Sequence, residues 1–280
     1  MKIGIFAKTF EGSDPATVLA AVKAAGFSAA QYNMACSGLA SMPDVLESGA
    51  ALAVAEAAQA TGIEISAVSG TYNMIHPDLV LREKGHAGLE VLAARCAAMG
   101  SHLITLCTGT RDAADQWRAH PDNNTPEAWR DLLGAMEIAI GIAERYNIHL
   151  GIEPELANVV NSAQKARQLI DELQSPRLKI VLDPANLFEV VSLEEQRRIV
   201  AAAIDLLADR IVMGHAKDRT PAGAFTTAGR GVLDYPHYLG CLNRIGFDGA
   251  LITHGLAAHE AADVAVFLNS ALAAAGMKAR

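Results

Sequence analysis

Cysteine is scarce in this sequence, and no two of its cysteines are close enough to form a recognisable motif. The four are Cys36, Cys96, Cys107 and Cys241, with no CxxC pair, so the sequence predicts neither a disulfide framework nor a structural zinc site. This usage favours a reduced, cytoplasmic setting. The apolar stretch in the opening MKIGIFAKTF is too short for the core of a signal peptide, so no targeting segment is expected.

Long hydrophobic runs and an excess of basic charge are also absent. No apolar run approaches the roughly 20 residues that span a bilayer. The 23 Lys and Arg residues are outnumbered by 31 Asp and Glu, which gives a net charge of -8. Nucleic acids and anionic membranes require a basic face, so neither is an expected partner, whereas a divalent cation is compatible with this charge. A hydrophobic content of 51% excludes a disordered chain.

A recurring pattern organises the residues that are present: a helical segment ends in Gly or Asn, and a short apolar strand follows. Both residue types accept the left-handed backbone just beyond a helix. The residues at these junctions are Gly26, Gly62, Gly100, Asn147 and Gly246. The predicted strands are 2–7, 28–33, 63–68, 102–107, 148–153, 178–183, 210–215 and 249–254. The predicted helices are 15–25, 43–60, 78–98, 126–146, 160–174, 193–207, 235–244 and 259–275.

Eight strand-then-helix units in 280 residues are typical of the TIM barrel, which uses about 250 residues as one domain. The alternative is an open doubly wound sheet, which often carries GxGxxG after its first strand. Here AKTFEGSDP occupies that place. Because no linker or change in composition divides the chain, we predict an α/β fold, a single (β/α)8 TIM barrel over residues 1–280.

The active site of such a barrel lies at the C-terminal ends of its strands. The last four strands end in GIEPE, VLDPANLF, VMGHAKDR and LITHGL, which place Glu153, Asp183, His215 and His254 at one level. A buried carboxylate is costly unless it is paired or metal-bound. Singly, each residue has an ordinary structural explanation, such as a loop cap. Together they predict a site for Mn²⁺, Mg²⁺, Co²⁺ or Zn²⁺.

Other residues near the strand ends are candidates for contacts with a substrate. The long loop after strand four carries Trp117, and an aromatic ring beside hydroxyl and amide groups suits a sugar. Packing of that loop against the barrel is the alternative role for Trp117. Cys107 lacks an activating base and is interpreted as packing. No dense Arg and Lys cluster marks a phosphate pocket, which favours an unphosphorylated substrate. The predicted substrate-binding residues are Thr108, Trp117, Asn158, Asn186, Asp218 and Arg219.

The motifs GIEPE, VLDPANLF and HAKD, with the eight-unit spacing, resemble the xylose isomerase-like TIM-barrel superfamily, the sugar-phosphate isomerase and epimerase group. The resemblance covers essentially the whole chain and implies that Glu153, Asp183 and His215 bind the metal. The epimerase branch has Glu as its fourth ligand, where this sequence has His254 or its neighbour Thr253. In that branch, this Glu and the strand-five Glu are the two bases of epimerisation. The departure therefore favours isomerisation or elimination.

The function implied is a divalent-metal-dependent isomerase or epimerase of a sugar, keto-sugar or cyclitol, acting through a metal-stabilised enediolate, with manganese among the expected metals. Candidate catalytic residues are Glu153, Glu155 and His254. One alternative is a lyase or dehydratase on a keto-sugar or keto-inositol. Others are a non-catalytic sugar-binding homologue and a metal phosphodiesterase, which the charge argues against. The expected partner is a small carbohydrate, and the oligomeric state, a homo-oligomer included, stays open.

Overall fold

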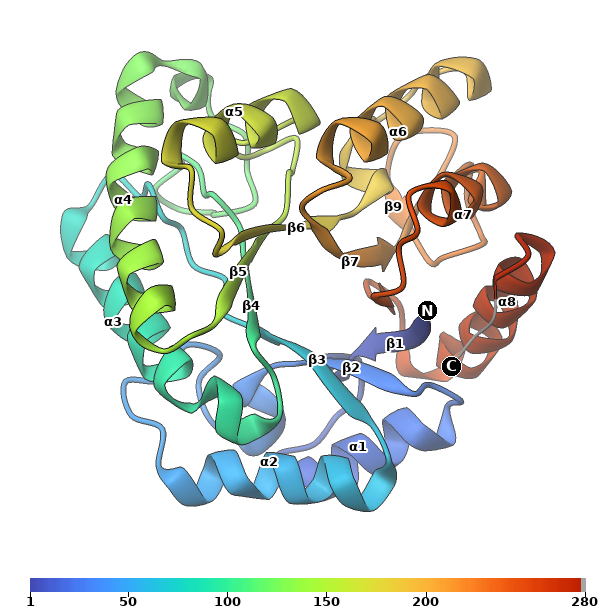
Figure 1. Cartoon of the computed structure of the whole chain (residues 1–280), viewed down its shortest axis with the longest axis horizontal. Helices are drawn as coiled ribbons and strands as arrows, with labels where there is room; N and C mark the ends of the chain where they lie inside the picture. Colours follow the sequence, from blue (N-terminus) through green and yellow to red (C-terminus); the bar gives the residue numbers. More distant parts are fainter. Residues whose placement is uncertain (278–280) are drawn as a thin grey trace.

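The computed structural model describes residues 1–277 as a closed barrel of parallel strands surrounded by helices (Figure 1). Around the barrel the strands follow the order β1-β10-β7-β6-β5-β4-β3-β2, so that β1 pairs with β10 and closes the ring. The predicted α/β (β/α)8 barrel is confirmed, and residues 278–280 lie outside the described part of the chain. The barrel strands are β1 (Lys2–Phe6), β2 (Ala29–Tyr32), β3 (Glu64–Ser69), β4 (Leu103–Leu106), β5 (His149–Ile152), β6 (Leu178–Leu182), β7 (Ile211–Ala216) and β10 (Ala250–Thr253).

An outer layer of helices covers the strands. All five predicted junction residues have positive φ, including Gly62 at 69° and Asn147 at 53°, which explains why each helix can stop and turn back towards the barrel. Within residues 1–277, no helix combines the length and apolar composition needed to cross a membrane. The helices are α1 (Pro15–Ala24), α2 (Ser48–Thr61), α3 (Leu79–Cys96), α4 (Pro126–Arg145), α5 (Ala163–Leu173), α6 (Leu193–Leu207), α7 (Tyr235–Arg244) and α8 (Ala261–Ala274).

Two predicted helices begin later than the sequence pattern indicates. The helix predicted at 43–60 starts at Ser48, because Glu47 is extended and Leu46 is buried in the preceding segment, where its carbonyl accepts a hydrogen bond from Arg95. The helix predicted at 160–174 starts at Ala163, after the N-cap Ser162. In both places, apolar residues that continue the helical pattern lie in the preceding loop and are buried there.

Alternation along the strands sets which side chains face the barrel interior, since successive residues point to opposite faces. A small apolar cluster inside the barrel includes Leu103, Val181 and Met213. Two residues further along each strand, Thr105 and His215 face the C-terminal mouth and line a cavity there. The inward-facing polar side chains at the mouth therefore form the layer directly above this apolar layer.

An antiparallel hairpin that the sequence analysis did not predict rises from the end of β7. Its strands are β8 (Asp218–Arg219) and β9 (Phe225–Thr226), joined by the five residues Thr-Pro-Ala-Gly-Ala, which include the turn formers Pro and Gly. The buried carboxylate of Asp218 accepts hydrogen bonds from the backbone N–H groups of Arg219, Gly229, Gly231 and Leu233. Asp218 was predicted to contact substrate, but in the structure its side chain bonds the loop after β9 and is outside the cavity lining.

Replacing Asp218 with Ala should therefore destabilise the fold. The change leaves several backbone donors without their acceptor, and we expect a loss of about 3 kcal/mol in the free energy of unfolding, measured by denaturant titration. Asp209→Ala is the matched control, because Asp209 is exposed and makes surface ion pairs with Arg167 and Arg210, which contribute about 0–1 kcal/mol. Equal losses in the two variants would contradict the structural role of Asp218.

Candidate metal centre and active-site cavity

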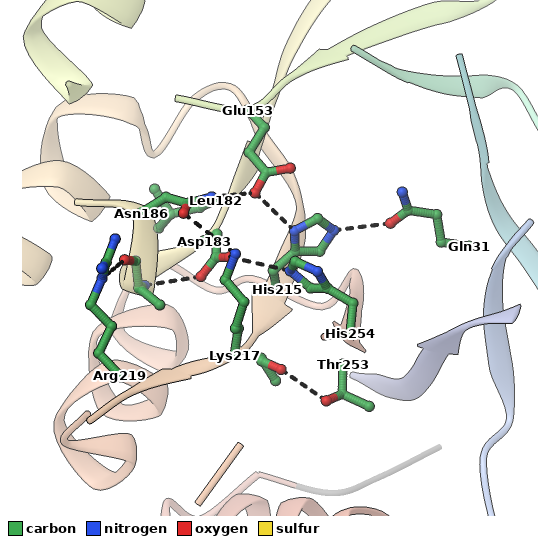
Figure 2. Close-up of polar contacts among 12 residues, drawn as sticks. Gln31, Glu153, Leu182, Asp183, Asn186, His215, Lys217, Arg219, Thr253 and His254 are labelled. Carbon is green, nitrogen blue, oxygen red and sulfur yellow. Dashed lines mark hydrogen bonds and ion pairs between the residues drawn. The ribbon is translucent and has the colours of Figure 1, made fainter. Parts of the chain in front are cut away.

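Four potential metal ligands converge at the C-terminal mouth of the barrel (Figure 2). Glu153 follows β5, Asp183 follows β6, His215 is the penultimate residue of β7, and His254 follows β10. One ligand atom from each lies within 4.8 Å of every other. The sequence analysis predicted that these residues share one level of the barrel, and the structure brings all four together.

Direct hydrogen bonds link the four side chains into pairs. Glu153 Oε1 lies 3.2 Å from His215 Nδ1, and Asp183 Oδ2 lies 3.2 Å from His254 Nε2. The two imidazole rings stand against each other with centroids 4.4 Å apart. Asp183 is fully buried, and its other oxygen accepts a hydrogen bond from the backbone N–H of Ala185, which fixes the carboxylate in the short turn after β6.

The charges in this cluster shift one another's pKa values. Burial alone raises the pKa of Asp183, but the Lys217 ammonium and the hydrogen bond from His254 outweigh burial and hold that pKa well below its usual range. Burial likewise opposes ionisation of Glu153, yet His215 lowers its pKa. Burial lowers the pKa of His254, and the neighbouring His215 acts in the same direction. The cluster therefore offers anionic oxygens beside an imidazole that favours its neutral form, as metal binding requires.

The donor set fits a single divalent cation. Four tetrahedral ligands at about 2.1 Å from a cation stand about 3.4 Å apart, so donor atoms that lie within 4.8 Å of one another can close around one ion with small side-chain shifts. Two carboxylates and two imidazoles suit Zn²⁺, Mn²⁺ or a similar first-row metal.

The fourth position is occupied by His254 and not by Thr253. The Thr253 hydroxyl is fully buried and donates to the carbonyl of Ala216 in the neighbouring strand, 2.9 Å away. Its side chain therefore hydrogen-bonds to the neighbouring strand, whereas His254 is the residue that hydrogen-bonds with Asp183. Of the two alternatives that the sequence left open, only His254 joins the cluster.

Two neighbours of the cluster were not assigned a role by the sequence analysis. Gln31, from β2, accepts from His215 Nε2 at 2.9 Å (Figure 2). It also donates to Thr105 Oγ1 at 3.1 Å. Lys217 is buried, with Nζ 3.2 Å from Asp183 Oδ2 and 3.4 Å from Asn186 Oδ1. Sequence reasoning missed Gln31 because its partner is 184 residues away; Lys217 stood within the HAKD motif, which was a usable signal.

The cluster opens into a cavity of about 760 Å³, lined by residues of both halves of the barrel. Of the predicted substrate-binding residues, Trp117, Asn186 and Arg219 line it. The Asn186 amide donates to Glu153 and accepts from Lys217. Thr108 and Asn158 are buried behind the wall, where they bond the backbone N–H groups of Val160 and Gly109. These two residues shape the loops of the cavity without lining it.

Glu155, a predicted catalytic residue, lines the same cavity two residues beyond Glu153. No side chain within residues 1–277 donates a hydrogen bond to its carboxyl group. Burial, followed by the negative charge of Glu153, raises the pKa of Glu155 to about 9. Cys107 also reaches the cavity, but burial raises its thiol pKa well above the usual value, in keeping with its interpretation as a packing residue.

Comparison with solved structures identifies similar barrels. At 17% identity, the apo 3-keto-D-glucoside 4-epimerase YcjR from E. coli superposes with a TM-score of 0.76 over 96% of this chain and 99% of that one. The IOLI protein with a binding zinc atom gives 18% identity and 0.74, over 98% of each chain. A probable 3-DHS dehydratase, AsbF from Bacillus anthracis, has 14% identity and a TM-score of 0.74, over 98% of this chain and 99% of that one. The TM-scores of 0.74–0.76 show that these proteins share the fold of this chain.

Family membership rests on a separate comparison. No curated protein sequence matches the chain. The model of one family, the xylose isomerase-like TIM barrel, matches residues 19–271, which is most of the chain and includes all four residues of the candidate metal centre. The chain therefore belongs to the xylose isomerase-like TIM barrel family.

Proposed function

We propose that this protein is a divalent-metal-dependent enzyme that isomerises a keto-sugar or a related cyclitol. The observation that carries the proposal is the group of four ligand atoms within 4.8 Å of one another, facing a large cavity that also holds a carboxyl group outside the ligand set. The solved neighbours include a keto-glucoside epimerase and a zinc-bound protein, which supports sugar chemistry at a metal centre.

Glu153, Asp183, His215 and His254 would hold the cation. A divalent cation bound there supplies Lewis-acid polarisation of a substrate carbonyl. Asn186 orients Glu153 through a hydrogen bond of 2.8 Å, and Lys217 balances the charge of Asp183. Gln31 accepts a hydrogen bond from Nε2 of His215, which turns Nδ1 towards Glu153 and the centre of the cluster.

Glu155 is the group that moves the proton. The charge of a bound cation would lower the pKa of its carboxyl group, which burial and Glu153 raise, so that Glu155 is ionised and serves as the base. It then removes a proton from the carbon next to the substrate carbonyl and returns it to the carbonyl carbon, while the hydroxyl proton of the first carbon passes to the former carbonyl oxygen, which interconverts aldose and ketose forms. Among the described residues, the other cavity carboxyl outside the ligand group is Glu189, which is exposed to solvent. A single enclosed carboxyl favours transfer on one face of the substrate and disfavours two-base epimerisation.

Elimination of a leaving group from the same deprotonated substrate is the second candidate function. It requires the same single base, and His254 in place of a second glutamate is the observation that favours it over epimerisation. The two reactions differ in their products, so NMR of keto-sugars incubated in D₂O with Mn²⁺ distinguishes them: isomerisation incorporates deuterium, and elimination forms an unsaturated product.

The metal assignment predicts a metal-dependent gain in stability. At a Mn²⁺ concentration of 100 times Kd, the protein freed of metal by chelation should gain about 2.7 kcal/mol, measured as a rise in Tm and by titration calorimetry. His215→Ala should lose most of this gain. His102→Ala is the matched control, since His102 is exposed at the opposite end of the barrel, before β4. If Mn²⁺ raises the Tm of the wild type and of His215→Ala equally, the metal assignment is wrong.

Gln31 should strengthen the binding of the metal without contacting the ion. Gln31→Leu removes the acceptor that orients His215, and loss of such an outer partner weakens metal binding by about 10–100-fold. Titration calorimetry with Mn²⁺ measures this change. Gln59→Leu, on the exposed face of α2, is expected to bind Mn²⁺ as wild type does. Unchanged affinity in Gln31→Leu would show that His215 is held by other contacts.

Replacement of Glu155 with Gln should separate binding from proton transfer. The amide has nearly the same shape but cannot exchange a proton, so deuterium incorporation from D₂O should fall by about 10²–10⁴-fold, while the Kd for Mn²⁺ changes little. Glu189→Gln, which changes the exposed carboxyl of the cavity, should reduce deuterium incorporation far less. Wild-type exchange rates in Glu155→Gln would assign the proton transfer to another group.

A further inference from the structure

The pairing of β6 with β7 ends immediately below two of the candidate metal ligands. The last paired residues of these strands are Leu182 and Gly214, and the register shifts by one residue earlier in the same ladder. Asp183 follows Leu182 in the chain, and His215 follows Gly214. Both ligands therefore lie one residue beyond the last β6–β7 pair, so the pairing of these two strands does not fix the separation between them.

A tyrosine of α7 connects the two strands at this point. The Tyr238 hydroxyl lies 3.2 Å from the carbonyl oxygen of His215 and 3.4 Å from that of Leu182. A phenol has one proton to donate, so the two carbonyls share it in a three-centre hydrogen bond. One carbonyl belongs to a ligand, and the other belongs to the residue that precedes Asp183. The hydroxyl therefore ties together the backbone segments that carry both ligands.

Gly214 makes this contact possible. A Cβ atom at Gly214 would lie 2.7 Å from the hydroxyl oxygen of Tyr238, which is closer than non-bonded atoms approach, so a larger residue would displace the hydroxyl from the two carbonyls. Gly214 is not among the glycines with positive φ, and its backbone conformation does not require glycine. The close approach of the tyrosine is what requires it.

A second tyrosine of the same helix holds the next part of β7. Tyr235 lies three residues before Tyr238, which places both side chains on one face of α7, and the two rings meet edge to face with centroids 6.4 Å apart. The Tyr235 hydroxyl donates to the carbonyl of Lys217 at 3.2 Å, and Lys217 is the cation beside Asp183. Both tyrosines are buried, so their rings are fixed by packing.

The first turn of α7 is anchored to α6, which gives the hydroxyl of Tyr238 a fixed starting point. The backbone N–H of Asp234 donates to Oε1 of the buried Gln196 at 2.7 Å. The carboxylate of Asp234 caps the helix by accepting a hydrogen bond from the N–H of His237 at 3.1 Å. Because the helix start is held in this way, the position of Tyr238 is set independently of the strand ends that it contacts.

We propose that Tyr238 is a positioning residue of the metal centre: its hydroxyl sets the separation of Asp183 and His215, and with it the affinity of the site for a divalent cation. This inference rests on the proposed function, because it takes both residues as metal ligands. Tyr238 does not line the cavity, so it acts through the strand ends and not by contact with a substrate. Ligand atoms that are held in place before the cation arrives bind it more tightly than ligands that must first be ordered.

Tyr238→Phe removes the hydroxyl and keeps the buried ring. The Kd for Mn²⁺, titrated into the metal-free full chain, should rise by about 10–100-fold. At saturating Mn²⁺, the electron paramagnetic resonance spectrum of the bound ion should also change, because its ligands are rearranged. Tyr146→Phe is the matched control, since the Tyr146 hydroxyl donates to Glu90 of α3, and both measurements should match the wild type. Circular dichroism of each metal-free variant establishes that it is folded.

Gly214→Ala tests the same contact without removing the tyrosine. The added methyl group displaces the hydroxyl from the carbonyls, so the Kd for Mn²⁺ should again rise by about tenfold or more. Gly240→Ala is the matched control, because Gly240 lies in α7 and a Cβ atom there meets nothing within 4 Å. This variant should bind Mn²⁺ as the wild type does.

Wild-type affinity and an unchanged spectrum in Tyr238→Phe would overturn the positioning role and leave the metal assignment intact. An equal loss of affinity in Tyr146→Phe would also overturn it, because the effect would then be one of general stability. Mn²⁺ binding that depends on Tyr238, without deuterium exchange or elimination in any keto-sugar, would support the positioning role and contradict the proposed reaction. Failure of the wild type to bind Mn²⁺ would overturn the metal centre and the positioning role together.

Discussion

The burial of Asp183 is the constraint on which the mouth of the barrel depends. A carboxylate with no exposure to water is costly unless its charge is balanced and its oxygens are hydrogen-bonded. Here Lys217, His254 and the N–H of Ala185 meet that requirement. Each comes from a different place in the chain, so β6, β7 and β10 must close in the correct register before Asp183 is stabilised. A cation at the same point would serve the same purpose.

The barrel supplies that register through alternation. Thr105, His215 and the other polar residues of the mouth lie one inward layer above a small apolar cluster, and parallel strands bring equivalent layers to the same height. The loops then add what the strands cannot. Asp218 organises the hairpin that carries Phe225, and Thr110 secures the loop that carries Trp117. The polar layer of the strands and the anchored loops together set the shape of the cavity.

Much of the architecture could be predicted from the sequence because its signals are local. Gly62 and Asn147 mark helix ends by the backbone conformation that they tolerate, and the predicted strands agree with the barrel to within a few residues. The late start of α2 was missed because the apolar segment before Ser48 is buried as a loop, which periodicity alone does not reveal. The hairpin was missed because its strands are only two residues long.

The sequence by itself determined the number of strand–helix units and which strand ends carry Glu153, Asp183, His215 and His254, since periodicity and position along a strand are properties of neighbouring residues. Only the tertiary structure decided that His254, and not Thr253, joins the cluster, that Gln31 orients His215, and that Asp218 supports a loop and does not line the cavity. Such choices depend on which partner a side chain meets across the barrel. Those partners are far apart in the chain and become neighbours only when the ring of strands closes.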